Sequence, residues 1–392
     1  MKKPIRVLHC PTSVGGNPQA LARAERELGL QSIAVAFDQN YLSYTTDETL
    51  FKPGEHQLIR ESKQWRLIWR ILRKVDIVHY NFGSTIFSDA LAANHTGSKY
   101  PQVLYKTFEA YRRLATIFDL PFLKRAGKKI VVTYQGDDAR QGDFCRAAFE
   151  ISPAAEVEPG YYTAESDERK RHSIARFERY ADRIYALNPD LMHVLPPQAE
   201  FLPYANVDLR EWTPSALSEL PKRLMVLHAP THRGAKGTSY ILEAVKRLQE
   251  EDGLEFDFRL VEGISHQEAR QLYERADLLI DQLLCGWYGG LAVEFMALGK
   301  PVICYLREQD LSFLPPPMRD DLPVINATPK TIYQVLKEWL TARRQDLLAT
   351  GTRGRLYVER WHDPLKIAAR LKKDYETIMG VKEAVESGAQ GE

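Results

Sequence analysis

The chain has 392 residues, a length that indicates two or three domains. Hydrophobic residues make up 44% and charged residues 27%, which excludes a disordered or fibrous protein, and a net charge of +1 gives no global nucleic-acid-binding signature. No apolar run approaches about 18 residues, and the start lacks the apolar core of a signal peptide, so we expect no transmembrane helix. Because the four cysteines are scattered, as in proteins of a reducing compartment, we expect a cytoplasmic location.

The first half of the chain alternates apolar runs, typical of buried strands, with helical segments. The strand expected at 5–10 is followed by a glycine-containing loop, and Asn17-Pro18 begins a helix that ends at Gly29. Further strands are expected at 32–37, 76–83, 129–136 and 183–188.

The second half alternates more evenly. A capping box at Ser265 and Glu268 begins one of its helices, and Gly299 and Pro301 end another. Strands are expected at 223–230, 256–263, 276–284 and 301–306, with helices between them at 237–250, 265–273 and 291–298.

Strands and helices that alternate at this spacing predict right-handed βαβ units and parallel sheets. Because the pattern restarts after the segment 202–212, we predict an α/β protein of two Rossmann-like parallel-sheet domains that face a central cleft. The predicted divisions are 1–203 for the first domain, 204–363 for the second domain, 364–379 for a helix that crosses back to the first domain, and 380–392 for a flexible tail.

Several common catalytic and cofactor motifs do not occur in the sequence. The patterns GxSxG, HExxH and GxGxxG are missing, which argues against an NAD-dependent dehydrogenase despite Asp38 at the end of a strand. The run from Gly234 to Thr238 looks like a phosphate-binding P-loop only superficially, because its lysine precedes the glycine. His228 and His232 flank a proline and share no helical face, so we expect no metal site there.

Charged residues and glycines are expected together at the carboxyl ends of the second domain's strands, the edge at which open α/β sheets bind ligands. Arg233 and Lys236 follow one strand, and Gly289-Gly290 precede a helix that carries Glu294 in its first turns. Two cations and a helix N-terminus suit a diphosphate, and a carboxylate suits the two hydroxyls of a ribose. The set therefore favours a nucleotide-diphosphate ligand.

Four segments resemble the retaining glycosyltransferases of family four, which have the GT-B fold. The most specific match is CGWYGGLAVEFMALGKPVI (285–303), which resembles the donor motif EGFGLxxLEAMAxGxPVI, and HRGAKGTSYILEAVKRL (232–248) resembles the phosphate-binding segment. VVTYQGDDAR (131–140) resembles HGSDxR, and LPYANVDLREWTP (202–214) resembles the hinge NGVDxxxFxP. The resemblance spans nearly the whole chain.

The resemblance implies a role for each matching residue. Arg233 and Lys236 bind the donor diphosphate, Glu294 binds the ribose, and Gln135 and Asp138 belong to the HGSD motif of the first domain, which we count with the catalytic residues. The implied backbone contacts to phosphate and sugar come from Gly289, Gly290, Leu291, Gly15 and Gly16. The family further implies retention of the anomeric configuration, no required metal or other cofactor, and transfer from a nucleotide-sugar donor to a glycan or lipid-linked acceptor, as in polysaccharide biosynthesis.

The sequence departs from the family's motifs at two positions. The first glutamate of the donor motif falls on Gly286, and the histidine of HGSD falls on Gln135, which can hydrogen-bond a sugar hydroxyl but cannot act as a base. Asp281, Gln282 or Asp137 is a candidate for the missing sugar contact. Two alternatives therefore stay open, a sugar-nucleotide-binding protein that has lost transfer and a nucleotide-sugar epimerase of the same fold.

The neutral total charge hides an uneven distribution. Residues 51–129 carry fifteen Lys and Arg against six Asp and Glu, a local charge of +9. Within them, the segment 63–74 predicts a helix with Trp65, Ile68, Trp69 and Leu72 on one face. Our first interpretation is a helix docked on the sheet by that face with a basic rim. The second is peripheral contact with an anionic membrane, at the inner face of the cell membrane.

Overall fold

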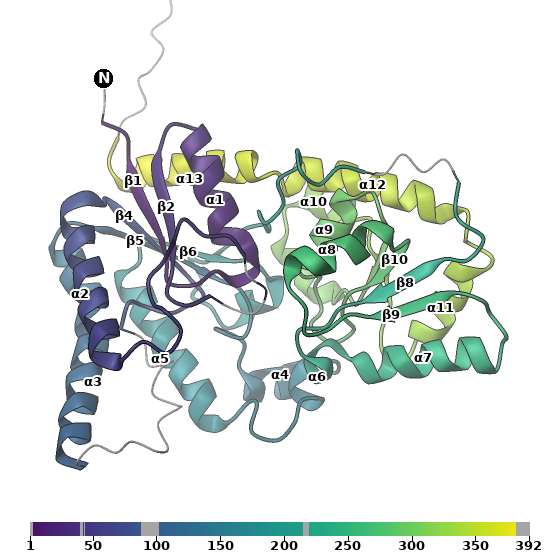
Figure 1. Ribbon diagram of the computed structural model, residues 1–392, viewed down its shortest axis with the longest axis horizontal. Coiled ribbons are helices and arrows are strands. Elements are labelled where there is room, and N and C mark those ends of the chain that lie inside the picture. The colour runs from purple at the N-terminus through teal and green to yellow at the C-terminus, as the bar shows by residue number, and fades with distance from the viewer. Residues whose placement is uncertain (1–2, 40–41, 43, 88–101, 215–218, 382–392) are drawn as a thin grey trace, which may run out of the picture.

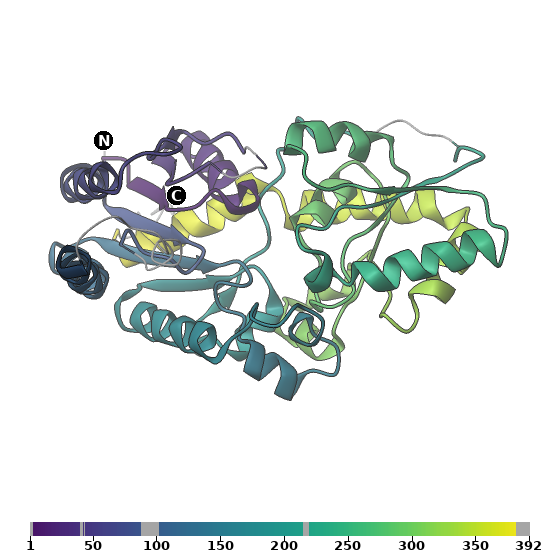
Figure 2. The ribbon, with the colours of Figure 1, turned by 60° about the horizontal axis from the view of Figure 1, so that its bottom comes forward.

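The computed structural model describes residues 3–39, 42, 44–87, 102–214 and 219–381. Two parallel sheets lie side by side, and helices cover both faces of each (Figure 1, Figure 2). The α/β architecture predicted from the alternating elements is therefore confirmed. Of the expected tail, residues 382–392 lie outside the described part of the chain.

The first sheet consists of β1 (Arg6–Cys10), β2 (Gln31–Ala36), β3 (Glu48–Thr49), β4 (Ile77–Asn81), β5 (Lys129–Tyr134), β6 (Arg183–Ala186) and β7 (Glu200–Phe201). Its strands are parallel in the order β3-β2-β1-β4-β5-β6-β7. Because side chains alternate along a strand, adjacent residues serve different cores. Leu8 and Val132 belong to one buried cluster, whereas Val7 and Val131 belong to another on the opposite face.

Helices cover the two faces of this sheet unequally. The cluster with Leu8 is closed by α2, α3 and α5, and the cluster with Val7 is closed by α1 and the last helix of the chain. The elements of this half are α1 (Asn17–Glu27), α2 (Gln57–Lys74), α3 (Gln102–Arg125), α4 (Gly142–Ala148) and α5 (Ala164–Tyr180), with the short 3-10 helices η1 (Val14–Gly16), η3 (Pro153–Ala155) and η4 (Pro189–His193).

The second sheet has the parallel order β12-β11-β10-β8-β9. Its strands are β8 (Met225–His228), β9 (Asp257–Leu260), β10 (Leu278–Ile280), β11 (Val302–Cys304) and β12 (Ile325–Asn326). The surrounding helices are α6 (Arg233–Lys236), α7 (Thr238–Glu250), α8 (His266–Arg275), α9 (Gly290–Ala297), η5 (Glu308–Phe313), α10 (Pro316–Asp320), α11 (Ile332–Leu340) and α12 (Asp346–Trp361).

The last helix, α13 (Pro364–Ile378), leaves the second domain and packs on the first, beside α1 (Figure 1). Asp363 caps its N-terminus by accepting a hydrogen bond from the Leu365 amide at 2.9 Å. The Tyr375 hydroxyl lies 2.7 Å from Nδ1 of His79 in the first sheet and donates to Glu25 of α1 at 3.0 Å. The chain therefore joins the two domains a second time, beyond the connection after β7.

The first interpretation of the segment 63–74, that its tryptophan face docks on the sheet, is wrong for both tryptophans. Ile68 is buried, but Trp65 and Trp69 are 47% and 54% exposed. The buried row of α2 is Gln64, Leu67, Ile68 and Ile71, which also follows the helical period, so the sequence contains two apolar rows and only one of them packs on the sheet.

Within the described residues, no helix is long and apolar enough to cross a membrane.

Candidate functional site

A cavity of about 320 Å³ lies between the two domains, at the carboxyl ends of strands from both sheets. This edge is where open α/β sheets bind ligands. Of the residues that the sequence predicts for the site, seven line this cavity, namely Gly15, Gln135, Lys236, Gly289, Gly290, Leu291 and Glu294. Three others are not among its lining residues, namely Gly16, Asp138 and Arg233.

The glycine loop after β1 forms the cavity's wall on the first domain. Gly15 and Gly16 have φ of 60° and 71°, a left-handed conformation that favours glycine. A side chain on Gly16 would lie 3.0 Å from the Tyr44 ring, so Gly16 is covered while Gly15 borders the cavity. Tyr44, which the sequence reasoning missed, also lines the cavity and packs against His266 of the second domain, with 4.7 Å between ring centroids.

The short helix α6 carries the two predicted cations in different environments. His232 caps this helix, because its Nδ1 accepts a hydrogen bond from the Ala235 amide at 3.1 Å. Lys236 faces the cavity, where its Nζ donates to Gln282 and lies 3.7 Å from a carboxylate oxygen of Asp281. Arg233 has a side chain that is 59% exposed and pairs with Glu262, itself a lining residue. One cation therefore lies inside the site and the other at its rim.

The N-terminus of α9 forms the floor of the cavity on the second domain. The first turn of a helix leaves its N–H groups unpaired, and Gly290 and Leu291 of this turn line the cavity. The preceding amide, of Gly289, donates to Asp281 at 2.7 Å. A side chain on Gly290 would lie 3.1 Å from Nδ2 of Asn206, a tight contact to which the Asn206 side chain would have to adjust. The positive end of the helix dipole and the Lys236 ammonium thus face the same space.

Glu294 lies one turn further along α9 and is 2% exposed. Its Oε1 lies 2.8 Å from Nε2 of His266 and accepts a hydrogen bond from Asn206 at 3.4 Å. Burial opposes protonation of His266, but the hydrogen bond and charge of Glu294 raise its pKa above the ordinary value. His266 begins α8 directly after its capping residue Ser265, and no motif in the sequence marks it as a partner of Glu294.

Gln135 and Asp138 have different positions in the loop after β5. The Nε2 of Gln135 is buried at the cavity and has no hydrogen-bond partner among the described residues. Asp138 lies behind it and accepts from the amides of Gln135, at 3.0 Å, and Gly136, at 2.7 Å. Burial raises the pKa of Asp138 to about 7 despite these two hydrogen bonds. Asp138 therefore shapes the loop, and Gln135 offers an amide donor to a ligand. Nδ2 of Asn17, which also lines the cavity and has no partner in the described part of the chain, offers another.

The space next to Gly286, where the resembling family carries a glutamate side chain, is occupied by the side chain of Arg307. The φ of Gly286 is 80°, and a side chain there would lie 2.6 Å from Nη1 of Arg307. Arg307 is 6% exposed, donates to Asp310 at 2.7 Å and to the Ile151 carbonyl at 2.8 Å, and stacks on the Phe149 ring at 3.7 Å. The space next to Gly286 thus belongs to a buried arginine with its own partners.

The three candidates for the missing sugar contact lie in different positions relative to the cavity. Asp281 lines the cavity beside Lys236, and Gln282 is buried beneath it, where its amide donates to the Trp287 carbonyl. Asp137 accepts from both Tyr161 and Tyr162 and from Arg140, and is not among the lining residues. Burial opposes ionisation of Asp137, but these partners bring its pKa to about 2.

The segment 142–163 extends from the first domain to the second and connects two parts of the site. Tyr161 donates to Asp137 at 2.6 Å, and its ring packs against His232 with 4.7 Å between centroids. The other nitrogen of His232 lies 3.1 Å from a carboxylate oxygen of Glu158. The loop of Gln135 and the capping residue of α6 are therefore linked through a segment that sequence reasoning did not assign to the site.

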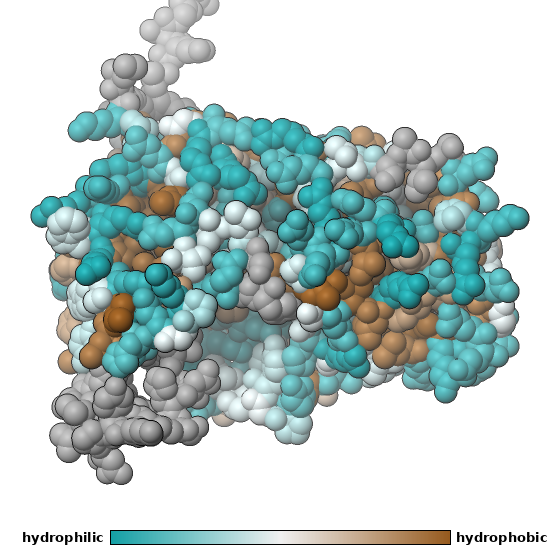
Figure 3. Space-filling model, in the orientation of Figure 1, coloured by the Kyte–Doolittle hydropathy of each residue, from teal (hydrophilic) through white to brown (hydrophobic). Residues whose placement is uncertain are grey.

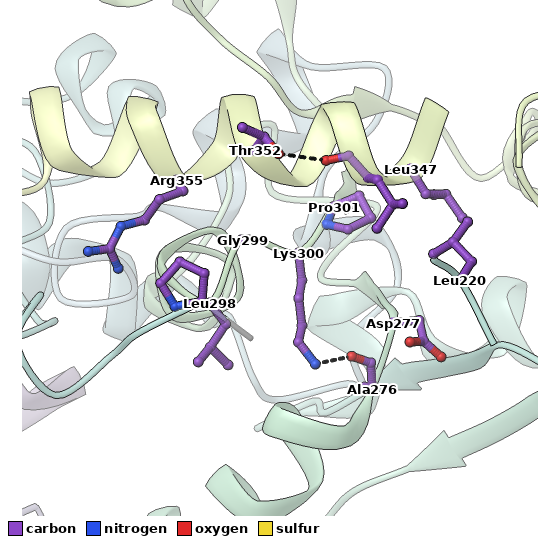
Figure 4. Close-up of a pocket in the computed structure, with 12 residues that line it drawn as sticks. Leu220, Ala276, Asp277, Leu298, Gly299, Lys300, Pro301, Leu347, Thr352 and Arg355 are labelled. Atoms are coloured by element: carbon purple, nitrogen blue, oxygen red, sulfur yellow. Dashed lines mark hydrogen bonds between the residues drawn. The ribbon is translucent and has the colours of Figure 1, made fainter. Parts of the chain in front are cut away.

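A second cavity, of about 170 Å³, lies on the second domain between α12 and the segments that precede β10 and β11 (Figure 4). Lys300 enters it and donates to the carbonyls of Ala276 and, at 2.6 Å, of Glu274. Burial lowers the pKa of Lys300 to about 8. Its ammonium holds the end of α8 against the sheet, and none of the predicted site residues lines this cavity.

No protein-family model and no curated protein matches the chain. Solved structures do match along nearly its whole length. Sucrose-phosphate synthase from Thermosynechococcus elongatus is 13% identical with a TM-score of 0.60, covering 97% of this chain and 100% of that one. Anabaena HepE in complex with UDP and glucose is 11% identical with a TM-score of 0.59, covering 96% and 100%.

A protein from Listeria monocytogenes assigned as a UDP-N-acetylglucosamine 2-epimerase also matches, at 11% identity and a TM-score of 0.50, covering 97% of this chain and 98% of that one. Identities this low show the fold alone. The chain therefore has the GT-B fold, as the resemblance in its motifs implies, and a glycosyltransferase from Rickettsia africae is among its structural neighbours.

Proposed function

We propose that this protein is a retaining, family-four-like glycosyltransferase that moves a sugar from a nucleotide-diphosphate donor to a glycan or lipid-linked acceptor. The observation that carries the proposal is the meeting of Lys236, the N-terminus of α9 and Glu294 in one cavity between two parallel sheets. A cation and a helix N-terminus suit a diphosphate, and a buried carboxylate suits a ribose. HepE, whose structures contain UDP-glucose or UDP and glucose, supports a donor of this chemical class.

The mechanism follows from the charges that develop during transfer. When the bond between the anomeric carbon and the diphosphate breaks, its electron pair goes to the phosphate oxygen and the sugar becomes positive. Lys236, the N–H groups of Gly290 and Leu291, and Arg233 at the rim oppose the negative charge on the leaving group, without a metal ion in this proposal. Asp281, which lines the same cavity, supplies a carboxylate for the positive sugar.

Gln135 and Asn17 give the donor sugar or the acceptor two amide donors that have no partner among the described residues. Such buried donors favour a hydroxyl-rich ligand, because an unpaired polar group costs free energy until a ligand pairs with it. In this scheme Asp138 is a positioning residue that holds the Gln135 loop through two backbone amides. Retention follows the family resemblance and involves no covalent bond to the protein.

A panel of UDP-, GDP-, ADP- and CMP-sugars tests the proposal. Thermal shift identifies the nucleotide that binds, since a ligand at a hundredfold excess over its Kd stabilises a protein by about 2.7 kcal/mol. The preferred donor is then incubated with the protein, with and without a glycan acceptor. Release of the nucleoside diphosphate with a new glycoside or free sugar supports transfer. If a donor binds but its sugar is neither transferred nor released, this contradicts the proposed activity and supports the binding-protein alternative.

The epimerase alternative is favoured by one observation, the full-length similarity to the Listeria protein. The same incubation separates it from transfer, because an epimerase converts the donor into its isomer while the sugar stays on the nucleotide. Analysis of the recovered nucleotide sugar by NMR distinguishes the isomer from the starting donor. An isomerised donor without any glycoside would overturn the proposed transfer.

A further inference from the structure

Exposed apolar side chains gather on two helices of the first domain, away from the cavity. Nine large hydrophobic side chains are exposed in the described part of the chain, and seven of them lie on α2 and α3. Soluble proteins scatter such side chains singly, whereas a cluster marks an interaction surface. The seven are Leu58, Ile59, Trp65 and Trp69 on α2, and Leu114, Phe118 and Phe122 on α3.

The two helices form one continuous surface, which we call the α2–α3 face. They run side by side in both Figure 1 and Figure 2, and Nε1 of Trp65 donates to the Tyr111 hydroxyl at 2.5 Å. Phe118 and Phe122 lie seven and eleven residues after Tyr111, so the helical period brings them to the same side of α3. In Figure 3, brown and pale side chains interrupt the hydrophilic surface over α2 at the left edge.

The fold does not need this surface. Each helix has a separate inner row in the core of the sheet, with Leu67 and Ile71 of α2 and Leu120 and Leu123 of α3 all at most 2% exposed. The outer rows are therefore additional, and they leave two tryptophans and two phenylalanines in water. Burial of these side chains against a partner is favourable in proportion to the apolar area removed from water.

The sequence of the two helices is strongly positive. Helix α2 carries six Lys and Arg and one acid, and α3 carries five Lys and Arg and two acids. Some cations of α2 are paired within the first domain, as Arg70 is with Glu48. Exposed cations that have no acidic partner among the described residues are Arg66, Arg73, Lys74 and, at the end of α3, Arg125.

The combination of exposed aromatic side chains and exposed cations on the α2–α3 face favours one kind of partner. The guanidinium of Arg73 lies 3.8 Å from the centre of the Trp69 ring, so an aromatic side chain and a cation share one position on the surface. Tryptophan is enriched at the level of lipid headgroups, and neighbouring Lys and Arg bind the phosphates of anionic lipids. We propose that the α2–α3 face docks on the surface of an anionic phospholipid bilayer, with Trp65, Trp69, Phe118 and Phe122 inserted at the headgroup boundary.

This placement leaves the cavity between the domains accessible. The α2–α3 face lies at the end of the first domain that is remote from the second domain (Figure 1). A bilayer on that face contacts neither α6 nor α9. The docking extends the predicted membrane contact from the segment 63–74 to two helices, and it does not depend on the proposed transfer activity.

Cosedimentation of the full chain with lipid vesicles tests the proposal. We expect binding to vesicles of phosphatidylcholine with about 30 mol% phosphatidylglycerol, little binding to pure phosphatidylcholine, and weaker binding in about 0.5 M salt, because the basic residues contribute through screened charge. The paired substitutions Trp65→Ser with Trp69→Ser, Phe118→Ser with Phe122→Ser, and Arg73→Gln with Lys74→Gln should each lower the partition coefficient at least about tenfold.

A matched control comes from the two remaining exposed leucines, Leu356 on α12 and Leu365 on α13. Their replacement by serine removes exposed apolar surface elsewhere on the molecule and should leave vesicle binding unchanged. Circular dichroism verifies that each variant is folded, and the charge variant retains the apolar core entirely. No binding to anionic vesicles at low salt, or an equal loss in the control, overturns the proposal. Self-association through the α2–α3 face without vesicle binding overturns it in favour of a second copy.

Discussion

Replacement of Gly286 by alanine tests whether Arg307 has taken over the space in which the resembling family carries its sugar-binding glutamate. The left-handed backbone at Gly286 costs an alanine about 1–2 kcal/mol. Its methyl group would also lie 2.6 Å from Nη1 and 2.8 Å from Cζ of Arg307. Arg307 cannot withdraw freely, because Asp310 and the Ile151 carbonyl hold it. Loss of one partner from a buried ion pair costs about 3–5 kcal/mol, so we expect Gly286→Ala to cost at least about 3 kcal/mol in total.

A matched glycine separates the two contributions. Gly253 belongs to the same domain and has φ of 65°, but a side chain there meets open space. Gly253→Ala should therefore cost only the backbone penalty of about 1–2 kcal/mol. Urea denaturation of both variants gives the change in unfolding free energy from the shift of the midpoint at constant slope. Equal destabilisation by the two substitutions would refute the role given to Arg307.

The same geometry predicts the outcome of restoring the glutamate. Gly286→Glu should not raise donor affinity or turnover, because its side chain begins inside the volume of Arg307 and brings a second carboxylate next to the buried Asp310. Donor affinity by calorimetry and turnover by nucleotide release are compared with the wild type. A stable Gly286→Glu protein with faster transfer would mean that Arg307 moves aside and that Gly286 marks a lost contact.

Three further substitutions address the cavity itself. Lys236→Ala should lower kcat at least about 100-fold, because one charge-stabilising group is lost, while Lys246→Ala on the outer face of α7 leaves kcat unchanged in the same assay. Glu294→Gln should raise the Kd of the nucleotide about tenfold or more by calorimetry, the scale of a hydrogen bond to a charged group. Because the folded pKa of His266 is raised, its pairing with Glu294 stabilises fully below the ordinary pKa of 6.5 and is lost as pH rises through the raised value. The melting-temperature difference between wild type and His266→Gln should therefore shrink from about pH 5.5 to about pH 8.5, and a constant difference would contradict the pairing.

Local sequence pattern was sufficient for the part of the site that lies at strand ends. A buried strand followed by Lys236, or a short loop followed by Gly290 and a helix, fixes where these residues lie in a parallel sheet whatever the rest of the chain does. The two parallel sheets are equally visible in the sequence, because each strand and helix carries its own period. The seven lining residues that the sequence predicts all belong to such strand-end segments.

Contacts between distant segments could not be predicted in this way. Tyr44 and His266 meet across the cavity, although neither belongs to a motif and more than two hundred positions separate them. Helical periodicity identified apolar positions in α2 but could not decide which of two rows faces the sheet, since Trp65 in one row and Leu67 in the other are both apolar. Likewise, a glycine in place of a glutamate reads as a missing contact until Arg307 is seen next to it.

Contacts join the two domains on both sides of the cavity, and they bear on how a donor enters. Near the returning helix, a buried hydrogen bond joins the domains, from the Ala205 amide to Asn17 at 2.6 Å. On the opposite side, where α4 and α6 meet in Figure 1, the exposed pair of Glu150 and Lys330 lies next to buried contacts. There the buried Arg307 donates to the Ile151 carbonyl at 2.8 Å, and His193 lies 2.8 Å from the buried Asp310. Exposed ion pairs contribute little to stability, whereas buried hydrogen bonds are costly to break. Opening of the cavity on the α4 and α6 side therefore has to break the contacts of Arg307 and His193 as well as exposed ion pairs, and it would move the segment 142–163 away from the cap of α6.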